Sequence, residues 1–505
     1  MSRFKACLVG VLLMLSGMAS AWAGKADDTL RITLRDAIPN VDPYYNTQRA
    51  GLIMATHVWD TLIDRDPTTS KLVPGLATEW RNVDDLTIEF KLRPDVKFQN
   101  GDTFSADDVV YTINTVIADK KVATPSNYAW IAGADKVDGL TVRVRLKKPF
   151  PVALEYLASV TPIWPKAYRE RVGEEEYSRR PVGTGPYAIT KLEGAGEIRM
   201  ERFEGRFTGG GKPRPAIKTI IFRSVADPTT QMAELIGGKA DWIEDVNADQ
   251  FNNLAGLPNV ATLRAEAQRM AYIVMNAAGR DNPESPIRDV RVRQAISYAI
   301  DRETMARQFM PGGSRVPDIV CFDTQFGCNS AGTIHYSYDP MKAKALLAEA
   351  GHSNGIDVEL YSYLAPPWGG AIQNYLRAVG INARLNQVQV SAAIQLFQQG
   401  KLPLAIGAWG GFGVNDVSTY LQYFFTATAL DQARDPKLQQ LVEQGGGTND
   451  ADARLKAYNE AFKVIAAQAY FLPLFTYVKN YAFTKDLDFK AYPDDWLRFY
   501  RASWK

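Results

Sequence analysis

Histidine and cysteine are both scarce in this chain, with three of each among 505 residues. The histidines, His57, His335 and His352, stand singly and far apart. No His-Glu-x-x-His motif or similar ligand spacing occurs, and two thiolates alone do not make a zinc site. The sequence therefore predicts no metal site, and no cofactor is expected.

An excess of charge of one sign is also missing. The 58 Lys and Arg residues nearly balance the 56 Asp and Glu residues, which gives a formal net charge of +2. Binding of nucleic acid or an anionic membrane needs a basic surface, so neither partner is expected. The length predicts two or three domains, and a hydrophobic fraction of 46% is ordinary for a globular protein.

Long apolar runs are limited to the N-terminus. Arg3 and Lys5 precede an apolar stretch at residues 6–18, and Ala21-Trp22-Ala23 follows as a small-x-small site. This run is too short to span a bilayer, which takes about 20 apolar residues, and its flanks are those of a signal peptide. We expect residues 1–23 to be removed by cleavage after Ala23. Cys7 stands too early in this leader to be a lipoprotein cysteine.

Export decides how the two remaining cysteines are interpreted. Cys321 and Cys328 are an even pair with six residues between them. In an oxidising compartment such a pair is typical of a structural disulfide.

Enzyme motifs are absent or occur in the wrong context. Residues 351–355 read Gly-His-Ser-Asn-Gly, but a nucleophile elbow must follow a strand and precede a helix. Here a predicted helix, capped by Asp339 and Pro340, ends at Gly351, and a strand follows. The linker-like stretch 209–215 contains the Gly-Lys pair of a phosphate loop. Pro213 follows this pair where a phosphate loop needs Ser or Thr, so the motif is incomplete. We predict that the chain is not an enzyme.

Predicted strands and helices alternate along the rest of the chain. Residues 86–92 and 141–146 show the period-two pattern of strands. Ser105 followed by Asp108 indicates a helix start, and residues 451–469 form a long helical segment. This mixture predicts α/β or α+β lobes.

Five ordered segments carry a family signature. They are Val-Asp-Pro at 41–43, residues 72–80 (LVPGLATEW), residues 90–109 (FKLRPDVKFQNG to ADDV), residues 182–187 (VGTGPY) and residues 289–302 (DVRVRQAISYAIDR). In this order they resemble the bacterial extracellular solute-binding proteins of family 5, which include the dipeptide-, oligopeptide- and nickel-binding proteins of ABC transporters.

The resemblance implies an α/β fold of the type II periplasmic-binding-protein kind, with two lobes joined by a hinge. Domain I would comprise residues 24–66, 181–275 and 481–505, domain II residues 67–180, and domain III residues 276–480. The ligand, a short peptide or peptide-like small molecule, would lie between the lobes and pair with an edge strand. The implied location is the periplasm, the implied partners are ABC transporter permease subunits, and a monomer is expected.

The segment that follows Trp409 is the first candidate for ligand contact. It runs Gly410, Gly411, Phe412, Gly413, Val414, Asn415, Asp416. Peptide-binding relatives usually place an Asp three residues after this Trp, to pair with the ligand's ammonium. This chain has Phe412 there, so either Asp416 substitutes or the ligand has no free amine at that point, because an unpaired buried charge costs several kcal/mol.

Other candidates for the ligand site are aromatic or cationic residues near the implied junction of the lobes. An ordinary core or surface role is the alternative for each of them. They are Tyr44, Tyr45, Tyr128, Trp130, Arg269 and Trp368.

Three further functions stay open at this point. The ligand could be an opine-like conjugate or another organic solute instead of a peptide. The protein could present its ligand to a chemotaxis receptor, or it could be a secreted hydrolase that uses Ser353.

Overall fold

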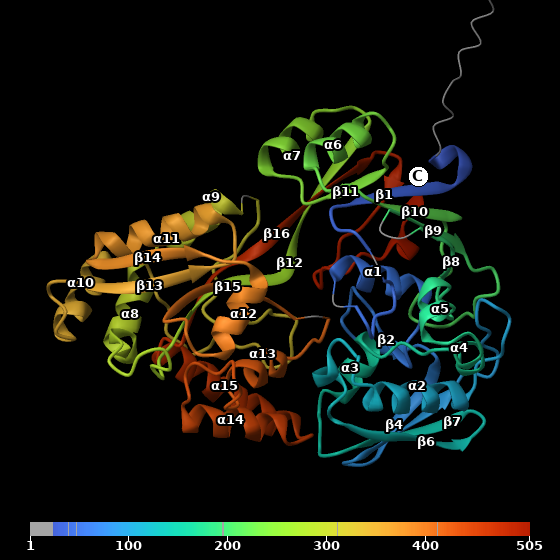
Figure 1. Cartoon of the computed structure of the whole chain (residues 1–505), viewed down its shortest axis with the longest axis horizontal. Helices are drawn as coiled ribbons and strands as arrows, with labels where there is room; N and C mark the ends of the chain where they lie inside the picture. Colours follow the sequence, from blue (N-terminus) through green and yellow to red (C-terminus); the bar gives the residue numbers. More distant parts are fainter. Residues whose placement is uncertain (1–23, 39, 47, 194–195, 311, 412) are drawn as a thin grey trace, which may run out of the picture.

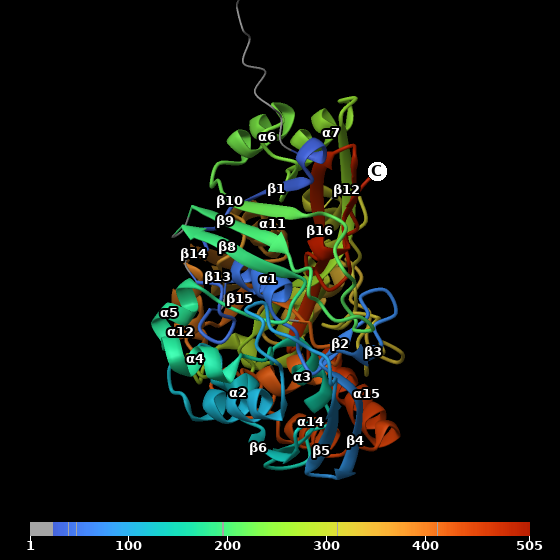
Figure 2. The same cartoon turned by 90° about the vertical axis from the view of Figure 1, so that its right-hand side faces the viewer.

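The computed structural model describes residues 24–38, 40–46, 48–193, 196–310, 312–411 and 413–505. The predicted signal peptide (1–23) and Phe412 lie outside the described residues. Two lobes stand side by side and are joined by two long strands (Figure 1). Figure 2, in which one lobe lies in front of the other, shows these two strands next to each other.

The largest sheet runs through both lobes. Its strands lie in the order β14-β13-β15-β12-β16-β11-β1-β10-β9-β8. Their bounds are Ile381–Gln387 (β14), Ile356–Ser362 (β13), Leu404–Gly410 (β15), Val260–Met275 (β12), Phe471–Thr484 (β16), Trp242–Glu244 (β11), Thr29–Leu34 (β1), Thr219–Ser224 (β10), Glu197–Arg202 (β9) and Tyr187–Glu193 (β8).

Smaller sheets complete the first lobe. A four-stranded sheet has the order β4-β5-β7-β6, and two pairs, β2-β3 and β17-β18, stand apart from it. Their bounds are Ile63–Arg65 (β2), Leu72–Pro74 (β3), Ala77–Asp84 (β4), Thr87–Leu92 (β5), Ile131–Asp138 (β6), Thr141–Leu146 (β7), Leu487–Asp488 (β17) and Ser503–Trp504 (β18).

Seven α-helices between the start of the chain and β12 belong to the first lobe, and eight α-helices after β12 belong to the second lobe, as far as the described residues extend. The first set is Arg49–Val58 (α1), Ala106–Ala118 (α2), Ala153–Ser159 (α3), Lys166–Val172 (α4), Glu174–Arg179 (α5), Pro228–Ile236 (α6) and Ala248–Ala255 (α7). The second set is Val290–Ala299 (α8), Arg302–Phe309 (α9), Pro340–Glu349 (α10), Pro366–Ala378 (α11), Val390–Gln398 (α12), Ser418–Phe424 (α13), Pro436–Gly446 (α14) and Ala451–Ala467 (α15).

Each lobe has its own hydrophobic core. In the first lobe one cluster joins residues between Leu30 and Ala502, so the segments predicted as domains I and II share it. In the second lobe, α8 to α11 cover one face of the sheet, and α12 to α15 cover the other (Figure 1). Separate cores are what two rigid bodies require. The finer domain boundaries stay a prediction.

Local signals explain several element ends. Ser105 caps α2, and its backbone N–H donates to the Asp108 carboxylate at 2.8 Å, as a capping box requires. The Asp339 carboxylate accepts the Lys342 N–H at 2.9 Å, and Pro340 opens α10. Because α10 precedes Gly351 and β13 follows it, Ser353 lies in a helix-to-strand loop, the reverse of a nucleophile elbow.

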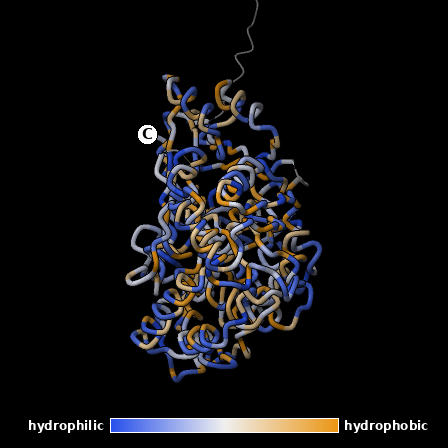
Figure 3. Tube along the Cα trace, turned by 90° about the vertical axis from the view of Figure 1, so that its left-hand side faces the viewer, coloured by the Kyte–Doolittle hydropathy of each residue, from blue (hydrophilic) through white to orange (hydrophobic). Residues whose placement is uncertain are grey.

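Apolar residues are interleaved with polar ones along the trace (Figure 3). Within the described part of the chain, no helix combines the length and the apolar character that a membrane crossing needs.

Asp42, in the turn after β1, is a buried carboxyl. It is 0% exposed, and its Oδ1 accepts the Tyr44 N–H at 3.1 Å. Burial raises the pKa of Asp42 from 3.8 to about 7, although the Tyr44 N–H and the Arg169 charge oppose the rise. The folded state therefore holds this proton more tightly than the unfolded chain does.

This difference predicts a pH-dependent stability. The stabilising contribution of protonated Asp42 is complete below pH 4 and is lost as the pH rises to about 7. We expect the free energy of unfolding to fall by up to about 4 kcal/mol across this window. Urea titrations at several pH values should show that Asp42→Asn removes this fall. An identical pH profile for both proteins would contradict the assignment.

Candidate functional site at the junction of the lobes

Strand direction brings the carboxyl ends of both half-sheets to the junction. β11 and β12 each run antiparallel to β16, so they share one direction, and β1 is parallel to β11. β15 is antiparallel to β12 and parallel to β13, so these two strands point back toward the first lobe. Ligands of α/β sheets bind outside the carboxyl ends of strands. The two lobes therefore present such ends to each other.

Within the second lobe, the chain order marks one pair of strands. The chain passes from β13 through α11 to β14, and then through α12 to β15 on the other side of β13. Helices α11 and α12 consequently lie on opposite faces of the sheet (Figure 1). Such a reversal is a topological switch point, where a crevice opens between the carboxyl ends of the two strands. The segment after Trp409 leaves from this place.

The antiparallel pairing of β12 and β16 is irregular where these strands pass from one lobe to the other. Their register shifts between Ala267 and Met270. There the Gln268 N–H donates to the Pro493 carbonyl at 2.6 Å, and the Gln268 amide donates to Thr324 Oγ1 at 2.5 Å. A bulge of this kind bends a strand and is a natural place for hinge motion.

Arg269, a predicted ligand residue, lies in this bulge. Its side chain is exposed, and its guanidinium lies 4.7 Å from the centre of the Tyr477 ring. Among the described residues, no carboxylate pairs with it. The Arg269 backbone is opposite Gly410 in the sheet. Arg269 thus holds an available cation where the two lobes meet.

A chain of ion pairs lies beside Arg269 at the carboxyl end of β11. Lys479 Nζ is 2.7 Å from Asp245 and 3.7 Å from Glu244. Arg49 is 2.9 Å from Glu244 and 3.0 Å from Asp495. These five groups carry one more negative than positive charge. Two of them, Asp245 and Asp495, adopt left-handed backbone conformations with φ near 60°, which is uncommon for residues other than glycine and frequent at functional sites.

Asp245 is the accessible end of this chain, because half of its side chain is exposed. Burial alone would raise the pKa of Asp245, but the charges of Lys479, Arg49 and Arg269 lower it below its usual value. Asp245 therefore stays ionised and can accept a hydrogen bond from a cation. Sequence reasoning missed it, since nothing in its local pattern separates it from a surface Asp.

The disulfide loop, residues 321–328, is hydrogen-bonded to the segment after Trp409. Cys321 and Cys328 are bonded, which confirms the predicted pair. Inside that loop, the Phe326 N–H donates to the Asn415 carbonyl at 2.9 Å, and the Val417 N–H donates to the Phe326 carbonyl at 3.0 Å. The disulfide loop thus acts as a strand partner that fixes residues 413–417.

Asp416 is committed to a buried ion pair. It is 3% exposed, and its carboxylate is 2.7 Å from Arg454 and accepts the Ser418 N–H at 2.9 Å. Arg454 also lies over the Phe326 ring at 4.5 Å. A ligand ammonium would have to compete with the Arg454 guanidinium for the Asp416 carboxylate. Ligand contact by Asp416 stays a prediction. The structure shows that its ion pair with Arg454 holds this segment to α15.

The same segment touches the first lobe. The Asn415 N–H donates to Glu155 Oε2 at 3.2 Å, and Glu155 pairs with Arg65. Gly413 has φ of +77°, and a Cβ at this position would lie 2.9 Å from Trp496 Nε1. Glu155 was not predicted, because its partner is 260 residues away. The lobes thus meet through a loop that needs glycine at its tip.

Four predicted aromatic residues pack inside the first lobe. The Tyr44 hydroxyl donates to the Pro162 carbonyl at 2.7 Å, and the Tyr128 hydroxyl donates to the Val160 carbonyl at 2.7 Å. The Tyr45 hydroxyl donates to Asp119 at 2.8 Å, and the Trp130 indole donates to the Asn127 carbonyl at 2.8 Å. The structure does not bring them together with the Trp409 segment, and a ligand role for them stays a prediction.

Trp368 and Trp409 lie in the second lobe. Trp368, in the first turn of α11, packs against Phe475 at 5.0 Å and Tyr477 at 5.6 Å between ring centres. Trp409 packs against Tyr423 at 5.0 Å. Trp368 therefore supports the ring on which Arg269 rests, and Gly410 and Gly411 continue from Trp409 toward the crossing strands.

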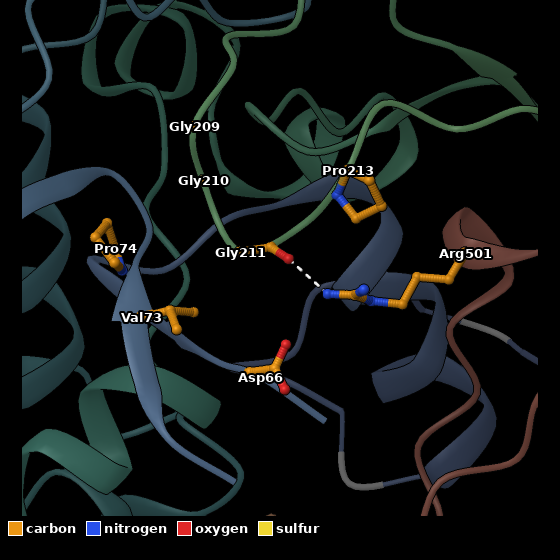
Figure 4. A pocket seen from close by; sticks show the side chains of 8 residues that line it. All are labelled: Asp66, Val73, Pro74, Gly209, Gly210, Gly211, Pro213 and Arg501. Atoms are coloured by element: carbon orange, nitrogen blue, oxygen red, sulfur yellow. Dashed lines mark hydrogen bonds between the residues drawn. The ribbon is translucent and has the colours of Figure 1, made fainter. Parts of the chain in front are cut away.

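Two hollows lie away from the junction. One has a volume of about 340 Å³ in the first lobe, where Arg501 donates to the Gly211 carbonyl at 2.7 Å (Figure 4). Lys212 donates to the Trp59 carbonyl at 2.6 Å, so the expected linker at 209–215 is a bound loop. The other hollow, of about 250 Å³, includes Asp241 and Trp504. Neither contains a residue of the junction described above.

The disulfide loop predicts a local effect of reduction. Replacing both cysteines, Cys321→Ser with Cys328→Ser, should destabilise the second lobe by about 2–3 kcal/mol, because an eight-residue loop is no longer closed in the unfolded chain. Hydrogen exchange at the Phe326 and Val417 amides should accelerate, and exchange at Gln99 in the first lobe should stay unchanged. Equal exchange at Val417 in both proteins would show that the disulfide does not support this segment.

Gly413 predicts an effect on how closely the lobes approach. Gly413→Ala should keep the lobes apart, lower ligand affinity at least tenfold and raise the radius of gyration in the presence of ligand, measured by small-angle scattering. Gly101→Ala is the matched control, because Gly101 has φ of +89° and open space around it. An equal loss of affinity in both variants would assign the effect to backbone strain.

The chain is similar to known binding proteins over nearly its whole length. It is 24% identical to the probable ABC transporter periplasmic-binding protein SapA of Escherichia coli K12, with 94% of both chains covered. A dipeptide-binding protein from Pseudoalteromonas sp. SM9913, solved with Met-Leu, is 20% identical with a TM-score of 0.78 and covers 94% of this chain and 100% of its own.

MoaA from A. tumefaciens R10, solved with mannopinic acid, is 23% identical with a TM-score of 0.76 and covers 94% and 99% of the two chains. Residues 71–432 match the middle region of one family. The chain belongs to the bacterial extracellular solute-binding proteins, family 5.

Proposed function

We propose that this protein is the solute-binding component of an ABC importer. It holds a short peptide or peptide-like small molecule between its lobes and passes it to the permease subunits. The observation that carries the proposal is the meeting of the carboxyl ends of β1 and β11 with those of β13 and β15, at an irregular point of the two connecting strands. It supports a solute site that both lobes complete.

The charges at the junction favour a ligand that has a carboxylate and an ammonium. Arg269 lacks an acidic partner among the described residues and can take the carboxylate in two parallel hydrogen bonds. If a ligand carboxylate neutralises Arg269, the ion-pair chain that ends in Asp245 keeps an excess of one negative charge, which the ligand's ammonium would balance. Asp416, by contrast, is already neutralised by Arg454.

This arrangement also accommodates the second candidate, an opine-like conjugate. Such a molecule has carboxylates but no primary amine at the position of the usual Asp, and Asp416 is unavailable here. The overall similarity to MoaA, which was solved with mannopinic acid, is consistent with that ligand class. The two candidates differ in how strongly binding should depend on Asp245.

Transport would follow a hinge mechanism. The ligand stabilises the closed state because it touches both lobes, and release at the membrane follows opening. The protein would act as a monomer in the periplasm after removal of residues 1–23, and the solute would be delivered chemically unchanged.

A binding experiment tests this function. The mature protein is unfolded and refolded to strip bound solutes, which are identified by mass spectrometry and then titrated back together with dipeptides and opines. We expect at least one carboxylate-bearing solute to bind and to reduce the radius of gyration. The absence of any bound solute and of any compaction would overturn the proposal.

Arg269→Ala should weaken binding of that solute at least tenfold, since a buried carboxylate would lose its charge partner. Arg264→Ala is the matched control, because Arg264 is on the same strand and also lies over a ring, that of Phe251 at 4.1 Å. Equal affinities of the two variants would remove Arg269 from the site.

A further inference from the structure

The last part of β15 has a sheet partner on one side only. On one side, β12 pairs with it as far as Gly410, opposite Arg269. On the other side, the pairing with β13 ends where Ser362 is opposite Ile406. Residues 407–410 therefore form an open strand edge at the switch point, which is where a ligand backbone could add as a further strand.

One side chain occupies part of this edge. The Ala408 N–H donates to the Tyr363 hydroxyl oxygen at 2.8 Å, and the Tyr363 hydroxyl donates to the Ala408 carbonyl at 3.3 Å. A single hydroxyl thus satisfies both backbone groups that a neighbouring strand would use. Tyr363 replaces the missing β13 residue at this position.

The turn that carries Tyr363 is held in place. The Leu364 N–H donates to Ser362 Oγ at 3.1 Å, and the Gln387 amide donates to the Leu364 carbonyl at 2.8 Å. Helix α11 begins two residues later, at Pro366. These bonds fix the backbone that carries Tyr363, and the two bonds to Ala408 hold its hydroxyl at the edge.

The backbone groups of Gly410, the next residue that faces this edge, are not bonded by Tyr363. Along an antiparallel strand, alternate residues direct their N–H and C=O groups to opposite sides. The Ala408 groups point away from β12, toward Tyr363, and those of Gly410 must point to the same side. The edge thus offers backbone groups at Gly410, close to Arg269, and withholds them at Ala408.

We propose that Tyr363 determines ligand length by capping the β15 edge at Ala408. A compact ligand can use the backbone at Gly410, whereas an extended peptide that continues along β15 meets a position whose donor and acceptor are already taken. The site therefore selects a dipeptide-sized molecule over longer extended peptides. This inference rests on the proposed function, and it concerns the size of the ligand.

Dialanine, trialanine and tetraalanine are the probes that test it. Wild type should bind tetraalanine at least tenfold more weakly than dialanine, if it binds it at all. Tyr363→Ala should improve tetraalanine binding at least tenfold, and tetraalanine N-methylated at the residue that faces Ala408 should gain nothing. Tyr338→Ala, which removes an exposed tyrosine elsewhere in the second lobe, should leave all affinities unchanged.

The outcomes separate this inference from the proposed function. Equal binding of dialanine and tetraalanine by wild type, or an unchanged tetraalanine affinity in Tyr363→Ala, would overturn the capping role. A protein that binds neither these peptides nor any co-purified solute would overturn the proposed function.

A second measurement needs no ligand. Tyr363→Phe keeps the ring and removes only the hydroxyl, so the fold should be retained. Hydrogen exchange at the Ala408 amide should then accelerate, while exchange at the Ile406 amide should not change. Equal Ala408 exchange in wild type and Tyr363→Phe would also overturn the inference.

Discussion

The antiparallel pairing of β12 with β16 is the interaction on which the rest of the molecule depends. One half of this ladder joins Val260 to Thr484 inside the first lobe, and the other joins Val274 to Phe471 inside the second. Because β11 and β15 align on these two strands, their directions fix which strand ends face each other. The register shift near Gln268 then places the least regular backbone of the sheet, with Arg269, between the lobes.

The charges at the crossing follow from the same constraint. The charged side chains that lie between the two lobes are partly buried, and an unpaired charge is costly there. Lys479, on β16, is bonded to Asp245, and Arg49, on α1, ties Glu244 to Asp495 in the C-terminal segment. The network therefore fixes the first lobe's side of the junction, with Asp245 half-exposed at its end and the Arg269 guanidinium nearby without a salt bridge among the described residues.

Short-range chemistry was predictable from the sequence. The capping pairs at Ser105 and Asp339, the strand at 141–146 and the Cys321–Cys328 bond involve residues close in the chain, so local pattern suffices. Family resemblance supplied the two lobes and the Trp409 segment.

Long-range pairing was not predictable. Asp416 is neutralised by Arg454, which lies 38 residues away, and Glu155 meets Asn415 from 260 residues away. Composition cannot tell a core ring from an exposed one; Tyr44 and Tyr128 are buried in the first lobe, and a ligand role for them stays a prediction. Tyr363 gave no signal at all, since its importance comes from where β13 stops pairing with β15.

Two hydrogen bonds between described residues join the lobes away from the paired strands β12 and β16. The Asn415 N–H bonds to Glu155 at 3.2 Å, and the Asn449 amide bonds to Asp85 at 3.2 Å on the exposed surface. Hydrogen bonds of this kind stabilise by about 0.5–1.5 kcal/mol each, far less than the roughly 5.5 kcal/mol that moves a two-state equilibrium from 1:99 to 99:1. These two bonds alone would not hold the lobes closed, so we expect a bound solute to supply much of the stability of the closed state. A solute held by one lobe alone would add nothing to closure, so the proposed contact with Arg269, on the strand that belongs to both lobes, would couple binding to closure.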